Sequence, residues 1–214
     1  VKEGRAALRK AARPFYFLNI KERDQEENMG IRKKMTAYAM IVLITGVSGA
    51  AWGANIYVSP AGGGGGSMGS PTDLQAALDT AQTNGEADTI FLQEGLYDAS
   101  TAGENTFAYG SGDNDGMKVT LSGSWNIAYT SQKTTDAPST VLDGGGTSRG
   151  LDIHADTTSF DFAIEYLRIE NGYLAAGNGN GVGLRVINDP GYAINLYILH
   201  VGFEANTAAE RGPG

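Results

Sequence analysis

The sequence predicts an all-β protein in which short strands stack as a solenoid behind one capping helix. Three observations predict this fold. Short runs with apolar residues at every second position follow one another along the second half of the chain, as half-buried strands do. Turns rich in Gly, Asn and Asp separate these runs. Corresponding apolar positions, Leu142, Ile169 and Ile198, recur 27 and 29 residues apart, within the range of solenoid repeats.

An antiparallel β-sandwich is the alternative architecture, because its strands also follow one another every ~8–12 residues. Two-residue hairpin turns of the Asn-Gly type are scarce in this chain, however. The best candidate, Asn171-Gly172, is not followed at once by a strand. We therefore favour the solenoid, in which a single coil cannot bury its inward side chains and must stack on the next.

One amphipathic helix is predicted over Pro71–Thr83. Ser70 is the expected N-cap, Pro71 the first helical residue, and Asp73 lies in the first turn, where the helix dipole favours an acid. Gly85 is the expected stop. The spacing i, i+3, i+4, i+7 places four residues on one apolar stripe, Leu74, Ala77, Leu78 and Ala81.

The strands are predicted from alternation and from flanking turn residues. Glu94-Gly95 is expected to be a turn, and the five glycines at 62–66 a flexible loop without the Lys of a phosphate-binding loop. The predicted strands are Asn55–Ser59, Thr89–Gln93, Lys118–Ser122, Thr140–Asp143, Gly150–His154, Phe162–Glu170, Val182–Asn188 and Tyr192–Leu199.

The N-terminal part of the chain has the pattern of an export signal. Residues 1–34 are basic, the run Met35–Val47 is apolar, and Ser48–Ala54 consists mostly of small residues, as at a cleavage site. A retained membrane helix over Met35–Ala54 is the alternative. We expect the true start at Met29 or Met35, and an extracytoplasmic protein, secreted or at the cell surface, with membrane contact only through this segment.

These boundaries predict four parts of the chain. They are a basic leader (1–34), a signal segment (35–54), an N-terminal cap of strand, loop, helix and strand (55–95), and solenoid coils that are incomplete at the C-terminal end (96–214).

Composition excludes several classes of partner and site. The chain has no cysteine, hence no disulfide framework and no thiolate metal site. Its net charge is −8, and the basic residues concentrate in the leader. An acidic body lacks the basic footprint of a nucleic-acid binder, so we expect no nucleic-acid partner.

The motifs resemble those of pectate-lyase-like right-handed parallel β-helix proteins of secreted or surface bacterial type. The segments that carry the resemblance are Asp73–Ala81, Ala87–Tyr97, Thr120–Asn126, Thr140–Gly146 and Leu167–Gly172. Phe203–Asn206 and Gly181–Leu184 are also similar to the alternating Phe-x-x-Asn and Gly-Gly-Ala-Ile motifs of polymorphic outer-membrane protein repeats. Val182 and Gly183 depart from the second of these motifs. The resemblance implies a right-handed parallel β-helix, with Phe203 inside and Asn206 bonding backbone at a turn.

Polar residues offer candidate chemistry without completing a catalytic motif. Six are expected to point outward, where they could line a groove, Asp152, His154, Glu165, Arg168, Glu170 and Arg185. The loop Gly110–Gly116 carries carboxylates that suit Ca²⁺, although a solvated turn is the favoured interpretation. His154 and His200 have no metal-ligand spacing. We assign no catalytic, metal or cofactor residue and expect no cofactor.

Aromatic side chains offer candidate sugar contacts, since a ring can stack on a sugar while a polar tip hydrogen-bonds. The aromatics expected at the surface are Tyr97, Tyr109, Trp125, Tyr129 and Tyr173.

From these observations we expect an exported, non-catalytic surface or extracellular segment for adhesion or carbohydrate contact, with polysaccharide or cell-surface components as partners. Two alternatives remain open. One is the N-terminal part of a polysaccharide lyase or hydrolase whose active site lies beyond residue 214. The other is a structural stalk of a large surface protein.

Overall fold

The computed structural model describes residues 53–101, 106–112, 114–134, 138–175 and 181–209. By its internal contacts the chain divides into two units, Val1–Ser48 and Gly49–Gly214, and every described residue belongs to the second. The predicted leader and nearly all of the predicted signal segment lie outside the described residues. Within the described residues, no helix is long and apolar enough to cross a membrane.

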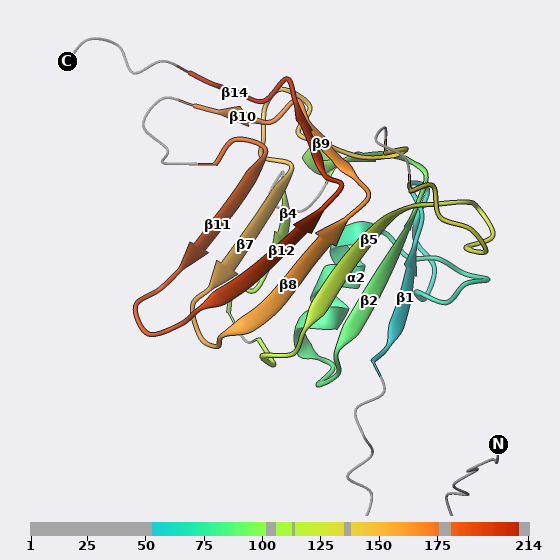
Figure 1. Cartoon of the computed structure of the whole chain (residues 1–214), viewed down its shortest axis with the longest axis horizontal. Helices are drawn as coiled ribbons and strands as arrows, with labels where there is room; N and C mark the ends of the chain where they lie inside the picture. The colour runs from blue at the N-terminus through green and yellow to red at the C-terminus, as the bar shows by residue number, and fades with distance from the viewer. Residues whose placement is uncertain (1–52, 102–105, 113, 135–137, 176–180, 210–214) are drawn as a thin grey trace, which may run out of the picture. The chain divides into compact units, whose positions relative to one another are not determined.

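The described part of the chain is all-β apart from two helices (Figure 1). Its elements are β1 (Asn55–Val58), α2 (Leu74–Thr83), β2 (Asp88–Gln93), β3 (Gly95–Asp98), the 3-10 helix η1 (Ala99–Thr101), β4 (Phe107–Tyr109), β5 (Val119–Trp125), β6 (Thr140–Asp143), β7 (Leu151–Ala155), β8 (Phe160–Glu165), β9 (Arg168–Glu170), β10 (Tyr173–Leu174), β11 (Leu184–Asn188), β12 (Ile194–Leu199), β13 (Gly202–Glu204) and β14 (Thr207–Ala208).

All the paired strands run parallel to each other. A five-stranded sheet has the order β1-β2-β5-β8-β12, a four-stranded sheet β13-β9-β6-β3, a three-stranded sheet β11-β7-β4, and a two-stranded sheet β10-β14. The chain visits the five-, four- and three-stranded sheets in that order, three times over. We call each such run a circuit: β2–β4, β5–β7 and β8–β11, with β12–β14 beginning a fourth. The prediction of an all-β protein is confirmed.

The register of the sheets brings equivalent side chains of successive circuits into rows. In the five-stranded sheet the row facing the core is Ile56, Ile90, Leu121, Ile164 and Ile198. In the four-stranded sheet it is Tyr97, Leu142, Ile169 and Phe203. In the three-stranded sheet it is Phe107, Leu151 and Leu184. These rows form one hydrophobic core, because each circuit covers the aliphatic side chains of its neighbour.

The rows end differently at the two sides of the stack. Ile164 and Ile169 are fully buried, whereas their register partners Ile198 and Phe203 are 48% and 49% exposed. Phe203 therefore stands at a core-facing register position, but no further circuit of the described chain covers it. The prediction that Phe203 is buried in the interior is wrong, because its side chain is half exposed in this structure.

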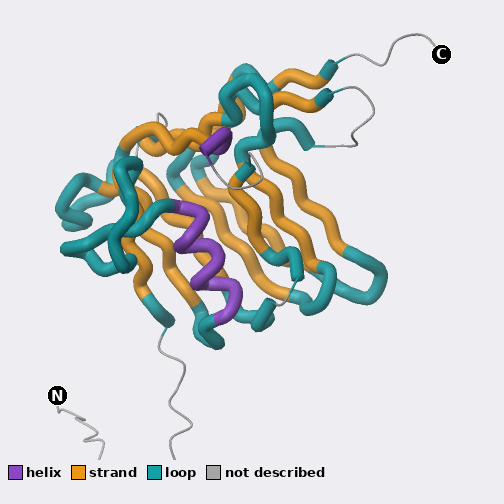
Figure 2. Tube along the Cα trace, turned by 180° about the vertical axis from the view of Figure 1, so that it is seen from behind, coloured by secondary structure: helices purple, strands orange, loops and turns teal. Residues whose placement is uncertain are grey.

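Helix α2 covers the opposite end of the core, packing against β1, β2 and β4 (Figure 2). Its predicted apolar stripe is confirmed, since all four residues, Leu74, Ala77, Leu78 and Ala81, are buried. The predicted stop is also borne out: Asn84 is the C-cap, and Gly85 follows with φ +75°, the left-handed conformation of a glycine stop.

The predicted start of the helix is wrong by one turn. The helix begins at Leu74, and Asp73 is the N-cap, its side chain accepting the Ala76 N–H at 2.8 Å. Ser70 instead pairs with Ser67 across a turn, and Pro71 lies outside the helix. The helix starts later because the backbone of Thr72 is hydrogen-bonded to β1, with which it forms a parallel bridge at Val58, and so cannot take part in a helical turn.

Three strand predictions need correction. Glu94-Gly95 is not a simple turn, because Gly95 begins β3. Phe162–Glu170 is not one strand: Tyr166 adopts φ +53° and divides it into β8 and β9. The repeat interval is confirmed for Leu142 and Ile169, which pair directly, but Ile169 and Ile198 are not equivalent. Ile198 pairs with Ile164 and Ile169 with Phe203, each 34 positions apart.

The corners between strands repeat in the same way as the strands. Tyr166 and His200 occupy one corner of successive circuits with φ near +50°, and their rings stack with centroids 5.1 Å apart. Asn171 and Ala205 occupy the next corner, again with φ of +50°. Left-handed backbone is unfavourable for residues other than Gly, so its recurrence at equivalent positions shows that the turn geometry is imposed by the stacking.

The predicted role of Asn206 is confirmed. Its side-chain oxygen accepts the Gly172 N–H at 2.8 Å, and its amide nitrogen donates to the Ile169 carbonyl at 3.0 Å. The amide also lies against Gly183, where an added Cβ would stand 2.7 Å from its Cγ. The Gly and Asn of the two short motifs thus meet in space, and each constrains the other.

We predict that truncating a residue of a core-facing row lowers the free energy of unfolding more when its side chain is fully buried than when it is half exposed. Ile164→Ala should lower the free energy of unfolding by about 2–5 kcal/mol, because it leaves a cavity in a close-packed row. Ile198→Ala, at the same register position, should cost about 1 kcal/mol or less, because its side chain is half exposed. Urea denaturation measures both values, and equal costs would contradict the described burial.

We also predict that Gly183 and Asn206 are energetically coupled. Asn206→Ala should cost about 1–3 kcal/mol, because it leaves backbone groups of Gly172 and Ile169 without their partner. Gly183→Ala should destabilise because its methyl group needs the space of that amide. In a double-mutant cycle, the doubly substituted chain should lose clearly less than the sum of the two single losses. Strict additivity would show that the contact is absent.

Candidate functional site

The outer surface of the five-stranded sheet carries a cluster of aromatic side chains. Tyr57 and Phe91 are register partners on β1 and β2, and they point outward because their neighbours along each strand point into the core. Their rings stack with centroids 5.3 Å apart. Trp125, at the end of β5, meets Phe91 edge-on at 5.1 Å. We call Tyr57, Phe91 and Trp125, all half-buried, the aromatic face.

A bulge places the tryptophan in this cluster. Phe91 pairs with Ser122, but Gln93 pairs with Trp125, so β5 has one more residue than β2 between the two pairs. Ser124 takes up the extra length with φ +61°. Because a bulge changes which way the following side chains point, Trp125 lies beside Phe91 instead of facing the core.

The segment after β5 folds back along the edge of the aromatic face. The Tyr129 ring packs edge-on against Tyr57 at 4.8 Å, and its hydroxyl donates to the Val58 carbonyl at 2.8 Å. Burial raises the pKa of Tyr129 to about 12, so the hydroxyl stays protonated and able to donate. The Gln93 side chain donates to the Ile127 carbonyl at 2.9 Å and holds the loop in place.

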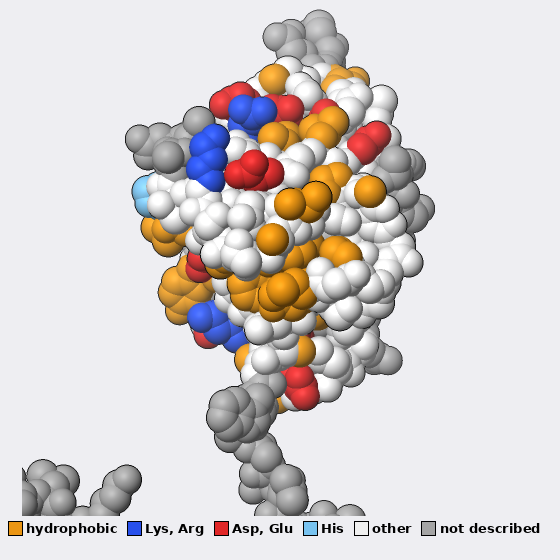
Figure 3. Space-filling model, turned by 90° about the vertical axis from the view of Figure 1, so that its right-hand side faces the viewer, with side chains coloured by type: hydrophobic (Ala, Val, Ile, Leu, Met, Phe, Trp, Pro, Cys, Tyr) orange, Lys and Arg blue, Asp and Glu red, His pale blue; other side chains and the backbone are white. Residues whose placement is uncertain are grey.

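Neutral polar groups border the aromatic face. The indole N–H of Trp125 donates to the Ser122 hydroxyl at 3.1 Å, and the Gln132 amide donates to the same hydroxyl at 3.0 Å. The side of the molecule that lies at the right of Figure 1, next to β1, shows hydrophobic side chains gathered among uncharged ones (Figure 3). Ser122 is only 4% exposed, so these hydrogen bonds hold Trp125 in place, and what the face offers to a ligand ring is aromatic planes for stacking.

Several of the aromatics that the sequence suggested for sugar contact are not at the surface. Tyr97, Tyr109 and Tyr129 are only 4%, 1% and 6% exposed. Tyr97 occupies a core-facing row, and its hydroxyl donates to the Val58 and Gln93 carbonyls. Trp125 and Tyr173 are half-buried, and Trp125 alone of the five belongs to the aromatic face.

Tyr57 and Phe91 were missed by sequence reasoning. Their alternation with buried aliphatics was available in the sequence, but it gave no sign that β1 and β2 are neighbours.

The six polar residues expected to share an outward groove lie on three different sheets. Asp152, His154 and Arg185 belong to the three-stranded sheet, Arg168 and Glu170 to the four-stranded sheet, and Glu165 to the five-stranded sheet. Asp152 is also only 7% exposed, because Arg185 covers it. The arrangement therefore does not bring these six residues together.

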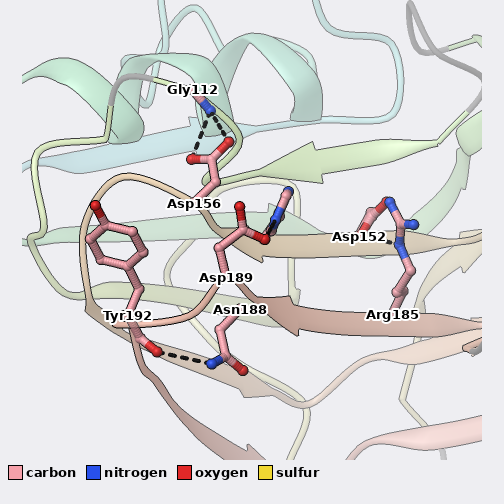
Figure 4. Close-up of polar contacts among 8 residues, drawn as sticks. Gly112, Asp152, Asp156, Arg185, Asn188, Asp189 and Tyr192 are labelled. Carbon is pink, nitrogen blue, oxygen red and sulfur yellow. Dashed lines mark hydrogen bonds and ion pairs between the residues drawn. The ribbon is translucent and has the colours of Figure 1, made fainter.

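Four of these residues form two ion pairs, Asp152 with Arg185 and Arg168 with Glu170, and Figure 4 shows the first of them. Both oxygens of Asp152 accept from the Arg185 guanidinium, and this hydrogen bonding raises the pKa of Arg185. His154 Nε2 lies 3.2 Å from Asp189 Oδ1.

Arg168 forms similar pairs on the four-stranded sheet. Its Nε lies 2.8 Å from Glu170 Oε2, and its Nη1 lies 3.4 Å from Glu204 Oε2. The pairing within both sheets leaves these side chains in structural contacts rather than directed at a common reacting atom.

The glycine-rich loop considered for Ca²⁺ secures the end of helix α2. Asp115 accepts the Gly85 N–H and the Met117 N–H, each through one carboxylate oxygen, while Asn114 accepts the Gly116 N–H. Asp113 lies outside the described residues. In the part of the chain that the structure describes, no three His, Asp or Glu side chains gather as a metal site.

A cleft of about 310 Å³ lies between α2 and β4. Its two glutamines bind the free backbone edge of β4: Gln75 exchanges two hydrogen bonds with Ala108, and Gln82 accepts from Gly110 and donates to Ser111. An unpaired strand edge invites other chains to bind. The cleft is therefore the place where the helix seals the sheet; the Thr106 and Tyr109 hydroxyls, which also line it, have no hydrogen-bond partner among the described residues.

No protein-family model, curated protein or solved structure matches this chain.

A buried acid lies beneath the same helix and was not anticipated from the sequence. Asp88 stands in the row of Val119 and Phe162, where other circuits have apolar residues, and is 2% exposed. Asn84 donates to its Oδ1 at 3.1 Å, but its Oδ2 has no hydrogen-bond partner among the described residues. Burial raises the pKa of this carboxyl above its ordinary value of 3.8, and the nearby Asp115 charge adds to the effect.

We predict that Asp88 destabilises the fold at neutral pH. A carboxyl with a raised folded-state pKa binds its proton more tightly when folded, so its cost is absent below pH ~4 and appears as pH rises through the folded-state pKa. Asp88→Asn should therefore stabilise the protein at pH 7 and lose this advantage in acid. Thermal unfolding of both chains from pH 3.5 to 8 measures the difference, and a stabilisation that does not change with pH would exclude this cause.

Proposed function

We propose that this chain is an exported, non-catalytic surface or extracellular segment that contacts carbohydrate through the aromatic face. The aromatic face is the observation that carries the proposal. It sets three outward rings on a rigid sheet rather than on a free loop, with the Trp125 indole held by the buried Ser122 hydroxyl. Sites on sheets hold their groups more precisely than sites on loops do.

The fold that we propose beneath this face is a right-handed parallel β-helix. The support is the repeated visit to the same three sheets in the same order, with parallel pairing and a recurring register. Crossovers between parallel strands of one sheet are right-handed in ~98% of cases, and this supports the hand. The resemblance of the N-terminal motifs to pectate-lyase-like proteins points to the same architecture.

Export is supported by the basic leader, the apolar run Met35–Val47 and the small residues that follow it. The absence of cysteine is compatible with export, since stacked circuits are held by packing and strand pairing and need no disulfide. N-terminal sequencing of the protein recovered outside expressing cells would test the signal. A mature start between residues 49 and 55 is expected, whereas retention of the segment Met35–Ala54 would contradict cleavage.

The non-catalytic part of the proposal is supported by the positions of the candidate acids and bases. They are spread over three sheets and paired within them, whereas acid–base chemistry needs groups converging on one bond. Calcium-dependent release of unsaturated uronate from a polysaccharide by the whole chain would contradict this part and favour a lyase.

We predict that Trp125→Ala weakens polysaccharide binding at least tenfold, which is about 1.4 kcal/mol, because truncating an aromatic anchor removes stacking area. Affinity electrophoresis of the whole chain through gels containing single polysaccharides measures the loss. Tyr173→Ala is the matched control, a half-buried aromatic on β10, outside the aromatic face. Equal losses in both variants, or none in Trp125→Ala, would contradict the assignment of the face.

A further inference from the structure

We infer that the ligand of the aromatic face is an uncharged polysaccharide rather than a uronate-bearing one. This inference rests on the proposed function and specifies its ligand class. It starts from the sequences of the five strands that form the sheet. They read NIYV, DTIFLQ, VTLSGSW, FDFAIE and INLYIL, without a Lys, Arg or His.

The charges that this sheet does carry are all acidic. Asp88 faces the core, while Asp161 and Glu165 are on β8 and are half exposed. The Asp161 carboxylate accepts from the Asn195 amide at 2.8 Å on the neighbouring strand. A polymer with a carboxylate on each sugar would therefore meet like charge along the sheet.

The cations of the described chain lie elsewhere or are engaged. They are Lys118, Lys133, Arg149, Arg168 and Arg185. Arg168 and Arg185 pair with acids of the other sheets. Arg149 donates to the Gly181 carbonyl. Lys118 precedes the first residue of β5, about 23 Å along that strand from Trp125 at ~3.3 Å per residue.

Lys133 is the critical residue for the inference, because its backbone lies beside the end of β5 that carries Trp125. Its backbone N–H donates to the Ser124 carbonyl, next to Trp125, and its ammonium group donates to the Ser139 hydroxyl at 2.9 Å. One lysine is a point charge, whereas recognition of successive carboxylates uses several cations and favours the bidentate fork of Arg.

The groups that do border the face suit hydroxyl-rich, neutral sugars. Ser122, Gln132 and the Trp125 indole are uncharged and hydrogen-bond one another beside the rings, and Ser122 is buried, so the rings are bordered by neutral groups without a fixed charge. The net charge of −8 adds a long-range repulsion of polyanions, strongest at low salt.

The test compares neutral and anionic polymers with the whole chain. Neutral glucans and galactans are set against polygalacturonate and alginate in affinity electrophoresis, at low and high salt. Binding to at least one neutral polymer is expected, weakened at least tenfold in Trp125→Ala. It should be unchanged in Lys133→Ala and nearly independent of salt.

Two other outcomes are informative in different ways. Preferential binding of a uronate polymer, weakened by Trp125→Ala, by Lys133→Ala and by salt, would overturn the ligand class while leaving the proposed carbohydrate contact in place. Binding of neither class would overturn both the ligand class and the proposed function. Circular dichroism of each variant confirms that the sheet has folded.

Discussion

The structure depends on one constraint, the register with which each circuit pairs in parallel with the next. A strand of two to seven residues buries little apolar surface alone, and an isolated circuit would leave its inward side chains in water. In register, Leu142 covers Ile169, and Leu121 covers Ile164, so that the rows reach the packing density of a protein interior. A slip by one residue would turn every inward side chain of a strand outward, and this makes the register strongly specified.

Stacking in register leaves the apolar rows open at each end of the stack, and the two ends differ in how the rows are covered. At one end α2 covers the aliphatic rows, and Gln75 and Gln82 satisfy the open backbone edge of β4. At the other end Ile198 and Phe203 keep their register but remain half exposed. The corners follow from the same geometry: Tyr166 and His200 accept left-handed backbone because the strands on either side are fixed by pairing.

The sequence predicts much of the fold because its dominant signals are local. Alternation located most strands, and the i, i+3, i+4 spacing located the buried stripe of α2. The errors come from competition that local pattern cannot show. Thr72 is taken into a bridge with Val58, which delays the helix to Asp73. The interval between circuits varies because insertions fall at the corners, so that Ile198 aligns with Ile164 rather than with Ile169.

The aromatic face was less predictable than the fold. Trp125 stands out by residue type, but its place beside Phe91 depends on the bulge at Ser124, and Tyr57 joins them only because β1 pairs with β2. Burial of Tyr97 and Tyr109 follows equally from their rows. The charge character of the face, by contrast, is readable from the strand sequences once the strands are known to share one sheet.

Disulfide trapping tests the parallel register most directly, because the chain has no cysteine of its own. Thr120 and Ala163 are register partners on β5 and β8 and point outward, with Cα atoms expected ~4.8 Å apart, within disulfide reach. Thr120→Cys combined with Ala163→Cys should form an intramolecular disulfide on mild oxidation. Thr120→Cys with Glu165→Cys, displaced diagonally to about 7–8 Å, should not. Cross-linking of the displaced pair but not of the register pair would contradict the account.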